Sequence, residues 1–441
     1  MLEKIEKLLL HLMVIELIIG GGGHLFNISS VSPVSIRIIL FALLLVVYGI
    51  RVLTNGGILN KEVNTFLKFD YLSISIYLLL FWSVFSAGLG LMYHHPRGLI
   101  ITDLLRVVYL LTFFPFRYYF DKQLIQKKTI MNYLLWGSLF IAVFTIAIDL
   151  LGMIVFRQSY GTYYEFVNQL WGKELFFRPS GGAFYKGHFM MLVGMLVACK
   201  DLTSGKKIIP NLALVILGYL SIYLSETRGL ILVFAIGIAA LTVLDYLGIF
   251  FQQGLSSFKN QFLSRKNIQR LAIYMVLIIS VPLMYREMTN SRFGAIDFEV
   301  GQQTNGEEVV IEDSSVNKRV ELFKASKDIS LSSPVTFVVG NGYGSKILDR
   351  TTGIEMSFVD IQVEQGLVGS LLWLNFLFMP ILFLFKYLPL KKIIGQFALP
   401  ISILLSIFVL TNINPFLNSP IGIGMVIGIA AINSVTLKEK V

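Results

Sequence analysis

The chain has 441 residues, of which 55% are hydrophobic and only 15% are charged, and its mean hydropathy is +0.72. Soluble domains carry about 25% charged residues, so this composition excludes an ordinary soluble protein. The formal net charge of +10 would also suit a nucleic-acid-binding protein. However, the Lys and Arg residues concentrate in alternate loops, which is the positive-inside pattern of membrane proteins, and no nucleic-acid partner is expected.

The apolar residues form blocks of about twenty, the length of helix that crosses a bilayer core about 30 Å thick. Backbone polar groups in lipid must be bonded internally, so membrane spans are helices or closed barrels. Blocks such as residues 230–247 lack the alternation of barrel strands. The sequence therefore predicts an all-α polytopic membrane protein with about twelve transmembrane helices, near residues 6–22, 34–54, 70–93, 98–119, 130–155, 184–200, 209–225, 229–251, 270–286, 366–387, 395–412 and 418–436.

The first apolar block is expected to remain as a span, because Glu16 interrupts it and no small-residue cleavage site follows. Twelve spans place both termini on one side of the membrane, and the Lys and Arg bias places that side in the cytoplasm. The cytoplasmic loops then hold Arg51, Lys61, Lys68, Arg117, Lys122, Lys127, Lys128, Lys200, Lys206, Lys207, Lys259, Arg265, Lys266, Arg270, Lys386, Lys391 and Lys392.

A single transmembrane domain is predicted for residues 1–441, with two long extracytoplasmic loops at 156–183 and 287–365. Of these loops, only the second has the composition of a soluble protein. Within it, residues 317–330 have apolar positions at helical spacing, with charged residues between them. This pattern predicts an amphipathic helix near the membrane surface, with its apolar side toward the membrane or the protein core.

Several arginines lie at or near the predicted outer membrane face: Arg178, Arg228, Arg286, Arg292 and Arg319. Arginine near a bilayer edge carries a desolvation cost that functional sites tolerate, and guanidinium binds phosphate oxygens through paired hydrogen bonds. Arg228 is the strongest candidate, because it stands between two apolar helices with almost no loop. Two alternatives remain open: arginines that only anchor helix ends, and a structural pair of Glu226 with Arg228.

A second signal is the sequence Gly-Asn-Gly-Tyr-Gly at 340–344, which contains Tyr343 and is followed by Glu355 and Asp360. The glycine-rich stretch is either a phosphate-binding loop or a flexible turn. A carboxylate at the mouth of a cavity can remove a proton from a sugar hydroxyl. Acidic residues are also favoured at a helix N-terminus by the helix dipole, so a structural role is open as well.

Other polar residues in the apolar segments are expected to bind substrate or to form ion pairs. Lys186 and His188 open the sixth predicted span next to Arg178 and are candidate substrate contacts. Two ion pairs are predicted, Asp103 with Arg106 and Glu16 with Arg37. There is no Asp-x-Asp pair, and the five His residues do not cluster at metal-ligand spacing, so no metal and no cofactor are expected.

Over roughly residues 175–370 the chain resembles the O-antigen ligase and Wzy-type polysaccharide polymerase superfamily. The likeness rests on four segments in the family's order. An Arg-Pro-Ser-Gly-Gly segment begins at Arg178, and Ser-Glu-Thr-Arg-Gly at 225–229 stands where the family has its S-R-G or T-R-G turn. Arg319 then opens a helix that leads through Pro334 to the turn at 340–344. The last segment runs from Glu355 through Glu364-Gln-Gly-Leu-Val-Gly at 364–369.

By resemblance, Arg228 and Arg319 would hold the pyrophosphate of an undecaprenyl-linked donor, and Glu355 would activate the acceptor hydroxyl. The resemblance also implies a metal-independent glycosyltransferase of the GT-C type in the bacterial inner membrane, possible partners being a chain-length regulator and a flippase. Ligases of the family have His at the position of Glu355, and this departure favours a polymerase that joins lipid-linked oligosaccharide repeats. Candidate substrate-binding residues are Arg178, Lys186, His188, Tyr343 and Asp360.

Two alternatives remain from the sequence. A ligase would pass glycan to lipid A core or protein, and would retain the same arginines. A transporter or flippase for lipid-linked glycans would need charged residues along a path through the membrane. The charges of this chain gather near one face instead, which favours an enzyme. The sequence does not identify the sugars, the linkage or the oligomeric state.

Overall fold

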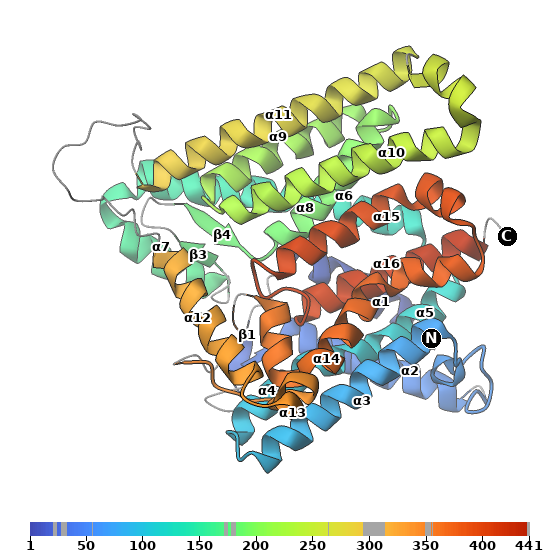
Figure 1. The fold of residues 1–441 in the computed structure, drawn as a ribbon, viewed down its shortest axis with the longest axis vertical. Coiled ribbons are helices and arrows are strands. Elements are labelled where there is room, and N and C mark those ends of the chain that lie inside the picture. Colours follow the sequence, from blue (N-terminus) through green and yellow to red (C-terminus); the bar gives the residue numbers. More distant parts are fainter. Residues whose placement is uncertain are drawn as a thin grey trace.

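The fold is a bundle of membrane-length helices, seen in a computed structural model (Figure 1). The structure describes residues 1–20, 24–27, 33–54, 56–171, 175–177, 182–262, 264–293, 314–348, 354 and 356–438. Each of the twelve predicted spans coincides with a helix in these ranges. The predicted fold class, an all-α polytopic membrane protein, is confirmed.

Within the described ranges, nine helical segments are long and apolar enough to cross a membrane. They are α2 (Ile36–Thr54), α3 (Tyr71–Met92), α4 (Arg97–Val108) continued by η2 (Tyr109–Thr112) and α5 (Phe113–Asp121), α6 (Lys127–Leu150) continued by the π-helical turn η3 (Leu151–Val155), α10 (Arg228–Phe262), α11 (Arg265–Phe293), α14 (Ser357–Leu382) continued by η5 (Phe383–Lys386), α15 (Leu390–Thr411) and α16 (Pro420–Lys438).

Three further predicted spans are helices of 16 to 18 residues: α1 (Leu2–Ile19), α8 (His188–Thr203) and α9 (Ile208–Leu224). Shorter elements connect the helices, namely η1 (Thr65–Leu67), η4 (Arg157–Ser159), α7 (Tyr160–Leu170), α12 (Ser314–Ser330) and α13 (Pro334–Val339). Two antiparallel strand pairs complete the described part, β1 (His24–Asn27) with β2 (Pro33–Ser35) and β3 (Leu175–Phe177) with β4 (Ala183–Tyr185).

The bundle has two distinct ends (Figure 1). Both chain termini lie at one end, here called the termini end, as an even number of spans requires. The opposite end, here called the loop end, carries α7, α12, α13 and the two strand pairs. A helix at 317–330 is confirmed as part of α12, which lies at the loop end, and its position near the membrane surface stays a prediction.

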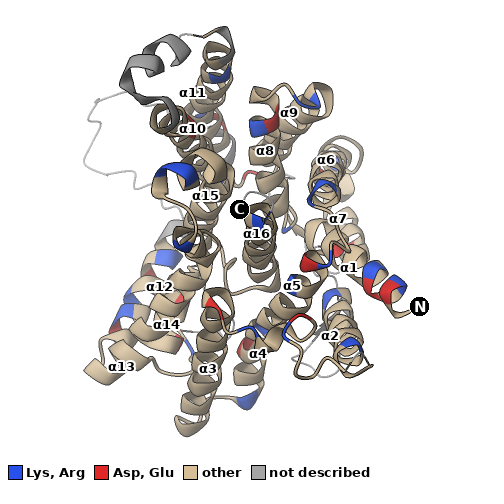
Figure 2. Cartoon of the chain, turned by 90° about the vertical axis from the view of Figure 1, so that its right-hand side faces the viewer, with Lys and Arg blue, Asp and Glu red and all other residues tan. Residues whose placement is uncertain are grey.

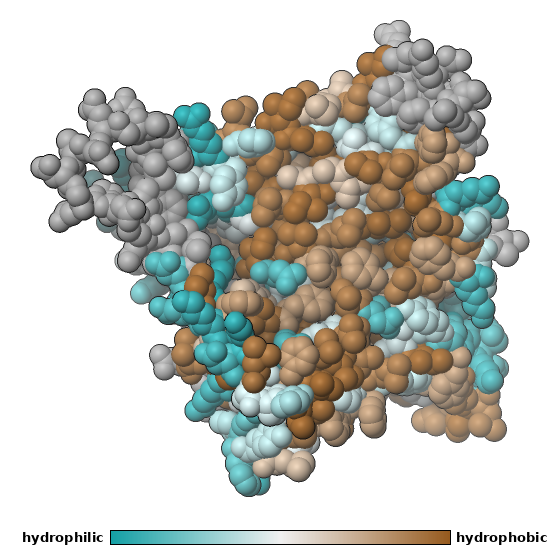
Figure 3. Space-filling model, viewed as in Figure 1, coloured by the Kyte–Doolittle hydropathy of each residue, from teal (hydrophilic) through white to brown (hydrophobic). Residues whose placement is uncertain are grey.

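An apolar belt lies between these ends (Figure 3). Large apolar side chains are exposed on its surface, among them Phe81, Val276 and Leu283, each more than 60% exposed. A surface of this kind would promote aggregation in water. In a membrane, the same side chains contact the apolar acyl chains of the lipids. The hydrophilic ends and the apolar middle in Figure 3 fit a protein that spans a bilayer.

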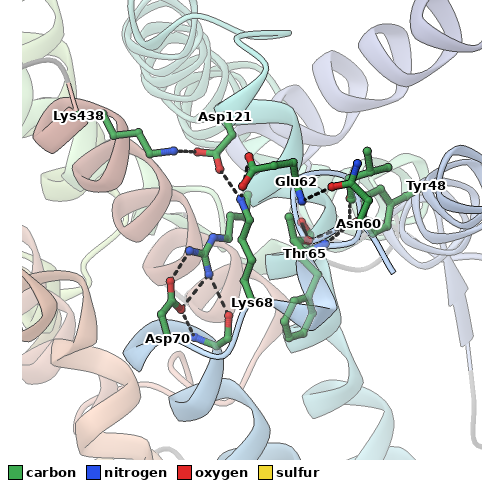
Figure 4. A network of polar contacts seen from close by, with 12 residues as sticks. Tyr48, Asn60, Glu62, Thr65, Lys68, Asp70, Asp121 and Lys438 are labelled. Carbon is green, nitrogen blue, oxygen red and sulfur yellow. Dashed lines mark hydrogen bonds and ion pairs between the residues drawn. The ribbon is translucent and has the colours of Figure 1, made fainter. Parts of the chain in front are cut away.

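Ion pairs hold the termini end together (Figure 4). Asp121 at the end of α5 accepts from Lys438 of α16 at 2.7 Å and from Lys68 at 3.3 Å. Arg117 forms an ion pair with Asp70, which caps α3. This network links the C-terminal helix to the loop between α2 and α3.

Both predicted internal ion pairs are confirmed. Nε of Arg37 lies 2.7 Å from Oε2 of Glu16, which links α2 to α1. Nη1 of Arg106 lies 3.4 Å from Oδ1 of Asp103, one helical turn away on α4. In both pairs a charge inside an apolar segment is balanced by its neighbour, which lowers the cost of its burial.

The boundaries of the large predicted loop differ from the observed helices. The span expected to end near residue 286 continues to Phe293 in α11, and the span expected to start at residue 366 begins at Ser357 in α14. The backbone of Gly366 leaves helical geometry, with φ of 66° and ψ of −168°, so α14 is two helical pieces joined at a kink. The sequence pattern located the second piece only, because the first is too polar to resemble a span.

Candidate active site

The turn between α9 and α10 places Arg228 at the loop end. Ser225 and Glu226 in this turn are buried, and Glu226 has a φ of +50°, a left-handed conformation that reverses the chain within three residues. Arg228 is the first residue of α10, is partly buried, and its guanidinium carbon lies 6.0 Å from the ring centroid of Tyr285. The unpaired N–H groups of a helix N-terminus add positive potential to the guanidinium there, so the position suits an anion.

The connection between α15 and α16, residues 412–419, is a meeting point for the start of α8 and the start of α10. A Cβ on Gly229 would lie 2.8 Å from Cγ2 of Ile413, so the first turn of α10 touches this connection. The rings of Phe189 and Phe416 pack edge to face with centroids 4.7 Å apart. The start of α8 therefore contacts the same connection.

The first turn of α14 is bound to this connection by hydrogen bonds. The hydroxyl of Ser357 donates to Oδ1 of Asn418 at 3.1 Å and accepts from the backbone N–H of Phe416 at 3.2 Å. The side-chain amide of Asn418 donates to Oδ2 of Asp360 at 3.3 Å. Asp360 is buried, and it also accepts a long bond from the N–H of Ile354 at 3.5 Å. The structure thus gives Asp360 a clear role in fixing the start of α14, and its contact with a substrate stays a prediction.

Two of the predicted site residues lie outside the described residues. These are Glu355, the candidate base, and Arg178, a candidate phosphate ligand. Their proposed roles stay predictions. The structure does describe the residues that flank Glu355 in the chain, since Ile354 is buried in a small apolar cluster and Ser357 is held as above.

Arg319 lies on the side of α12 that packs toward α14. Leu322 and Ser326 of α12 are buried, and Leu322 packs in one apolar cluster with Ile354 and Val363. Arg319 precedes Leu322 by three residues, so both lie on neighbouring positions of one helical face. This partly buried arginine is therefore directed toward the part of the chain that contains the start of α14.

Lys186 and His188 lie where β4 passes into α8. Nζ of Lys186 lies 5.8 Å from the ring centroid of Phe176 in β3, within the range of a cation–π contact. His188 is fully buried, with Nε2 2.8 Å from the hydroxyl of Ser221 and Nδ1 2.8 Å from the backbone oxygen of Tyr185. Both ring nitrogens thus have partners inside the protein and tie α8 to α9. Substrate contact by either residue stays a prediction.

The glycine-rich stretch at 340–344 is a rigid turn packed into the helices. The backbone N–H groups of residues 341–344 all donate to protein oxygens: to Val363 O, Glu364 O, Ser86 O and Oδ2 of Asp103. Because these donors are already used, the turn does not offer them to a phosphate. Tyr343 is buried, its hydroxyl accepts from Gln365 at 3.1 Å, and burial raises the pKa of its phenol well above the ordinary value. A substrate contact by Tyr343 stays a prediction.

The comparisons with known proteins agree with the motifs. No family model matches the chain. The chain is similar to an O-antigen polymerase of Shigella flexneri, with 27% identity over 438 residues, which cover 98% of this chain and 95% of the relative. The resemblance to the Wzy-type polymerases is confirmed. Because the similarity covers nearly the whole chain, it includes the four motif segments and the helices that position them.

Asp149 is a buried acid at the loop end that the sequence reasoning missed. It lies near the end of α6 and is fully buried, and the backbone N–H of Ala183 in β4 is close enough to stabilise its carboxylate, although the described residues form no hydrogen bond of regular geometry with it. It is close enough to Glu226 for their charges to interact. A Cβ on Gly182 would lie 2.1 Å from the backbone oxygen of Leu224, so the chain entering β4 packs on the same turn. The sequence does contain a signal for Asp149, because an ionisable residue inside an apolar block indicates a functional site.

A second group of acids lies behind the turn at 340–344. Asp103 forms the ion pair with Arg106 described above and hydrogen-bonds to Glu364, which is buried. Asp360 is close enough to interact with both. This group connects the turn to the start of α14. Across the described ranges, no three His, Cys, Asp or Glu side chains are arranged to hold a metal ion.

Proposed function

We propose that the protein is a polysaccharide polymerase that joins undecaprenyl-pyrophosphate-linked oligosaccharide repeats. The observation that carries this proposal is the similarity over nearly the whole chain to an O-antigen polymerase. The growing chain is transferred from its lipid to the non-reducing end of the incoming repeat. Arg228 and Arg319, both at the loop end, supply the positive charge that a lipid pyrophosphate requires.

The proposed orientation places the loop end outside the bacterial inner membrane and both termini in the cytoplasm. It is supported by the charge distribution, since Lys68 and Lys438 lie together at the termini end (Figure 4), and Arg117 pairs with Asp70 beside them. Lys and Arg favour the cytoplasmic side of membrane proteins. In this orientation the described parts of the loops at 156–183 and 287–365 lie over the outer face.

The proposed reaction is a direct displacement at the anomeric carbon of the lipid-linked sugar. The acceptor hydroxyl oxygen forms the new glycosidic bond, and the bond from that carbon to the pyrophosphate oxygen breaks. The hydroxyl proton passes to a base, for which Glu355 is the candidate. Negative charge develops on the leaving pyrophosphate, and Arg228 and Arg319 stabilise it electrostatically. This scheme assigns the reaction to the metal-independent GT-C type of glycosyltransferase.

The arrangement around residues 412–419 supports a site built from several helices. The starts of α8, α10 and α14 contact this connection, and α12 packs on the segment before α14. A site assembled in this way holds two substrates in fixed orientation, which lowers the entropic cost of a reaction between them. We further propose that a flippase supplies the lipid-linked repeats and that a chain-length regulator limits the product.

The proposal is tested with purified protein in liposomes that contain undecaprenyl-pyrophosphate repeat units and no other enzyme, with the products resolved on a gel. A ladder of repeats is expected. Transfer to added lipid A core without a ladder would identify a ligase. Movement of the substrate across the bilayer without any new glycosidic bond would identify a transporter, and either result would overturn the proposal.

A further inference from the structure

A large apolar cavity lies within the helical bundle and extends from the side of the candidate active site, at Met190 and Ile421, toward the termini end. Its volume is about 440 Å³, and it is enclosed mainly by α1, α6, α8, α15 and α16. Figure 2 looks onto the termini end and shows α16 in the middle of these helices. The deeper wall is apolar and includes Leu17, Leu134, Met190, Val193 and Ile421. Water is poorly held in a cavity without polar partners, so an apolar chain is the suitable occupant.

Polar and basic residues line the cavity only toward the termini end. Lys127 lies at the start of α6 and Lys200 in the last turn of α8, with Lys206 just beyond. Asn433 and Thr436, in the last turns of α16, add polar groups at the same end. The cavity is therefore apolar along its length and positively charged at one end.

The carboxylates around these lysines do not cancel this charge. Lys200 forms an ion pair with Asp245 of α10. Asp201 follows Lys200 in α8 and interacts electrostatically with Lys200, Lys206 and Lys207. Lys127 donates a hydrogen bond to Thr436 at 3.1 Å, which holds its ammonium group at the rim. Three lysines, Lys127, Lys200 and Lys206, line the cavity, and neither Asp245 nor Asp201 does.

The length of the cavity matches a lipid chain. Its lining residues on α16 extend from Ile421 to Thr436, fifteen positions or about 22 Å along the helix axis. Half of a bilayer core is about 15 Å thick. The cavity can therefore hold an acyl chain that enters from the termini-end leaflet and reaches the middle of the membrane.

The geometry points to a binding site for a phospholipid with an anionic headgroup, such as phosphatidylglycerol. The acyl chain occupies the apolar cavity, and the headgroup phosphate binds Lys127 and Lys206 at the termini end. Basic pockets between membrane helices recognise anionic lipids in this way. The headgroup end of this site is separate from the candidate active site, since Lys200 lies twelve residues, or about 18 Å, along α8 from His188, whereas the apolar end reaches Met190. The inference does not depend on the proposed polymerase activity.

Two variants separate the headgroup contact from the acyl-chain contact. In the double variant Lys127→Gln/Lys206→Gln the charge is removed while the ion pair of Lys200 with Asp245 stays intact. Gly428 lines the cavity, and a Cβ placed on it meets no atom within 4 Å, so the Gly428→Leu side chain starts in open space and takes up cavity volume. The matched controls are Lys122→Gln/Lys128→Gln, two exposed lysines outside the cavity, and Gly49→Leu, a helical glycine in open space elsewhere.

The test measures lipid retention. Delipidated protein is incubated with vesicles of phosphatidylcholine that contain either phosphatidylglycerol or undecaprenyl phosphate, and bound lipid is counted by native mass spectrometry. The wild-type protein and both controls should retain phosphatidylglycerol in preference to phosphatidylcholine. The lysine double variant should lose this preference by about tenfold, and Gly428→Leu should retain neither lipid.

Three results would overturn the inference. Equal retention of phosphatidylglycerol and phosphatidylcholine by the wild-type protein would exclude an anionic site. Full retention by Gly428→Leu would place bound lipid outside the cavity. Stronger retention of undecaprenyl phosphate than of phosphatidylglycerol, lost in Gly428→Leu, would assign the cavity to the polyprenyl carrier.

Discussion

The side-chain amide of Asn418 donates to Oδ2 of Asp360 across 3.3 Å and joins the α15–α16 connection to the first turn of α14. Asp360 is buried, so this bond satisfies a carboxyl oxygen that water does not reach. Ser357 bonds to the same asparagine at 3.1 Å. Asn418, together with the backbone N–H of Phe416, therefore holds the start of α14, the segment that follows the candidate base, against its neighbours.

We expect Asn418→Ala to lower both stability and activity. The change leaves Asp360 and Ser357 without their partner, at a cost of about 1–3 kcal/mol, and it frees the start of α14. The matched control is Asn412→Ala, because Asn412 lies in the same connection, is exposed, and bonds only within its own helix, to the backbone oxygen of Phe408. Thermal unfolding in detergent and the product ladder are the measurements. Equal unfolding temperatures and equal ladders for the two variants would remove Asn418 from this role.

The turn at 340–344 should tolerate no side chain at Gly342. Its φ of +83° is unfavourable for other residues, and a Cβ there would lie 2.3 Å from the backbone nitrogen of Gly90. We expect Gly342→Ala to lower the free energy of unfolding by at least about 2 kcal/mol through strain and overpacking. Gly49→Ala, at a helical position with open space around it, should keep stability or raise it slightly, because alanine favours a helix more than glycine does. An unfolding temperature of Gly342→Ala equal to that of the wild type would contradict this prediction. It would show that the turn at 340–344 can move away from the backbone of Gly90 without a loss of stability.

The helices of this fold follow from the sequence, whereas the packing of its turns does not. Blocks of about twenty apolar residues determine the spans, since a bilayer leaves few other solutions. The glycine at 342 packs against the backbone of Gly90, about 250 positions earlier in the chain. No local sequence pattern predicts that contact. The kink at Gly366 is similar, because Gly366 abuts the backbone of Val338 and Gly340. Composition and periodicity do not predict such backbone contacts between residues that are far apart in the sequence.

The candidate site also has a part that the sequence predicts and a part that only the structure shows. Arg228 and Arg319 are predicted from their places at or near the outer membrane face and from the order of the family motifs, and the structure places the start of α10 and α12 at the loop end. His188 drew attention as a polar residue at a span end, yet its ring nitrogens are used between α8 and α9. Residue type and position in the chain suggest chemistry, but only the surrounding contacts separate a ligand-binding side chain from a structural one.

Substitution of Arg228 should abolish the proposed polymerisation without unfolding the protein. Arg228→Ala removes a group proposed to stabilise the leaving pyrophosphate, and loss of one such donor typically costs about 10² to 10³ in rate. Arg228→Lys should recover only part of it, because an ammonium cannot make the paired hydrogen bonds of guanidinium. Arg319→Ala should behave like Arg228→Ala.

The control for these arginines is Arg97→Ala. Arg97 also opens a helix at the loop end, α4, but it is exposed to the surroundings. Initial rates of ladder formation are compared at equal amounts of folded protein. If Arg97→Ala lowers the rate as much as Arg228→Ala does, the effect is a general loss of positive charge at this face, and the specific phosphate contact is excluded.

Asp149 offers the sharpest separation of activity from stability. It is buried with no hydrogen bond of regular geometry among the described residues, and only the backbone N–H of Ala183 lies close to its carboxylate, whereas the buried Asp245 is paired with Lys200 and accepts from Tyr274 at 3.0 Å. Asp149→Asn keeps the shape of the side chain and an oxygen that can face the backbone N–H of Ala183, so the unfolding temperature should change little. A costly buried group is retained where function needs it, and the ladder should therefore shorten, with a rate lowered by about tenfold or more.

Asp245→Asn should do the reverse, because it breaks a buried ion pair at a cost of about 1–3 kcal/mol while the folded fraction keeps its activity. A normal ladder from Asp149→Asn would make this carboxyl a structural residue of α6 and leave Glu355 as the only acid proposed to act in the reaction.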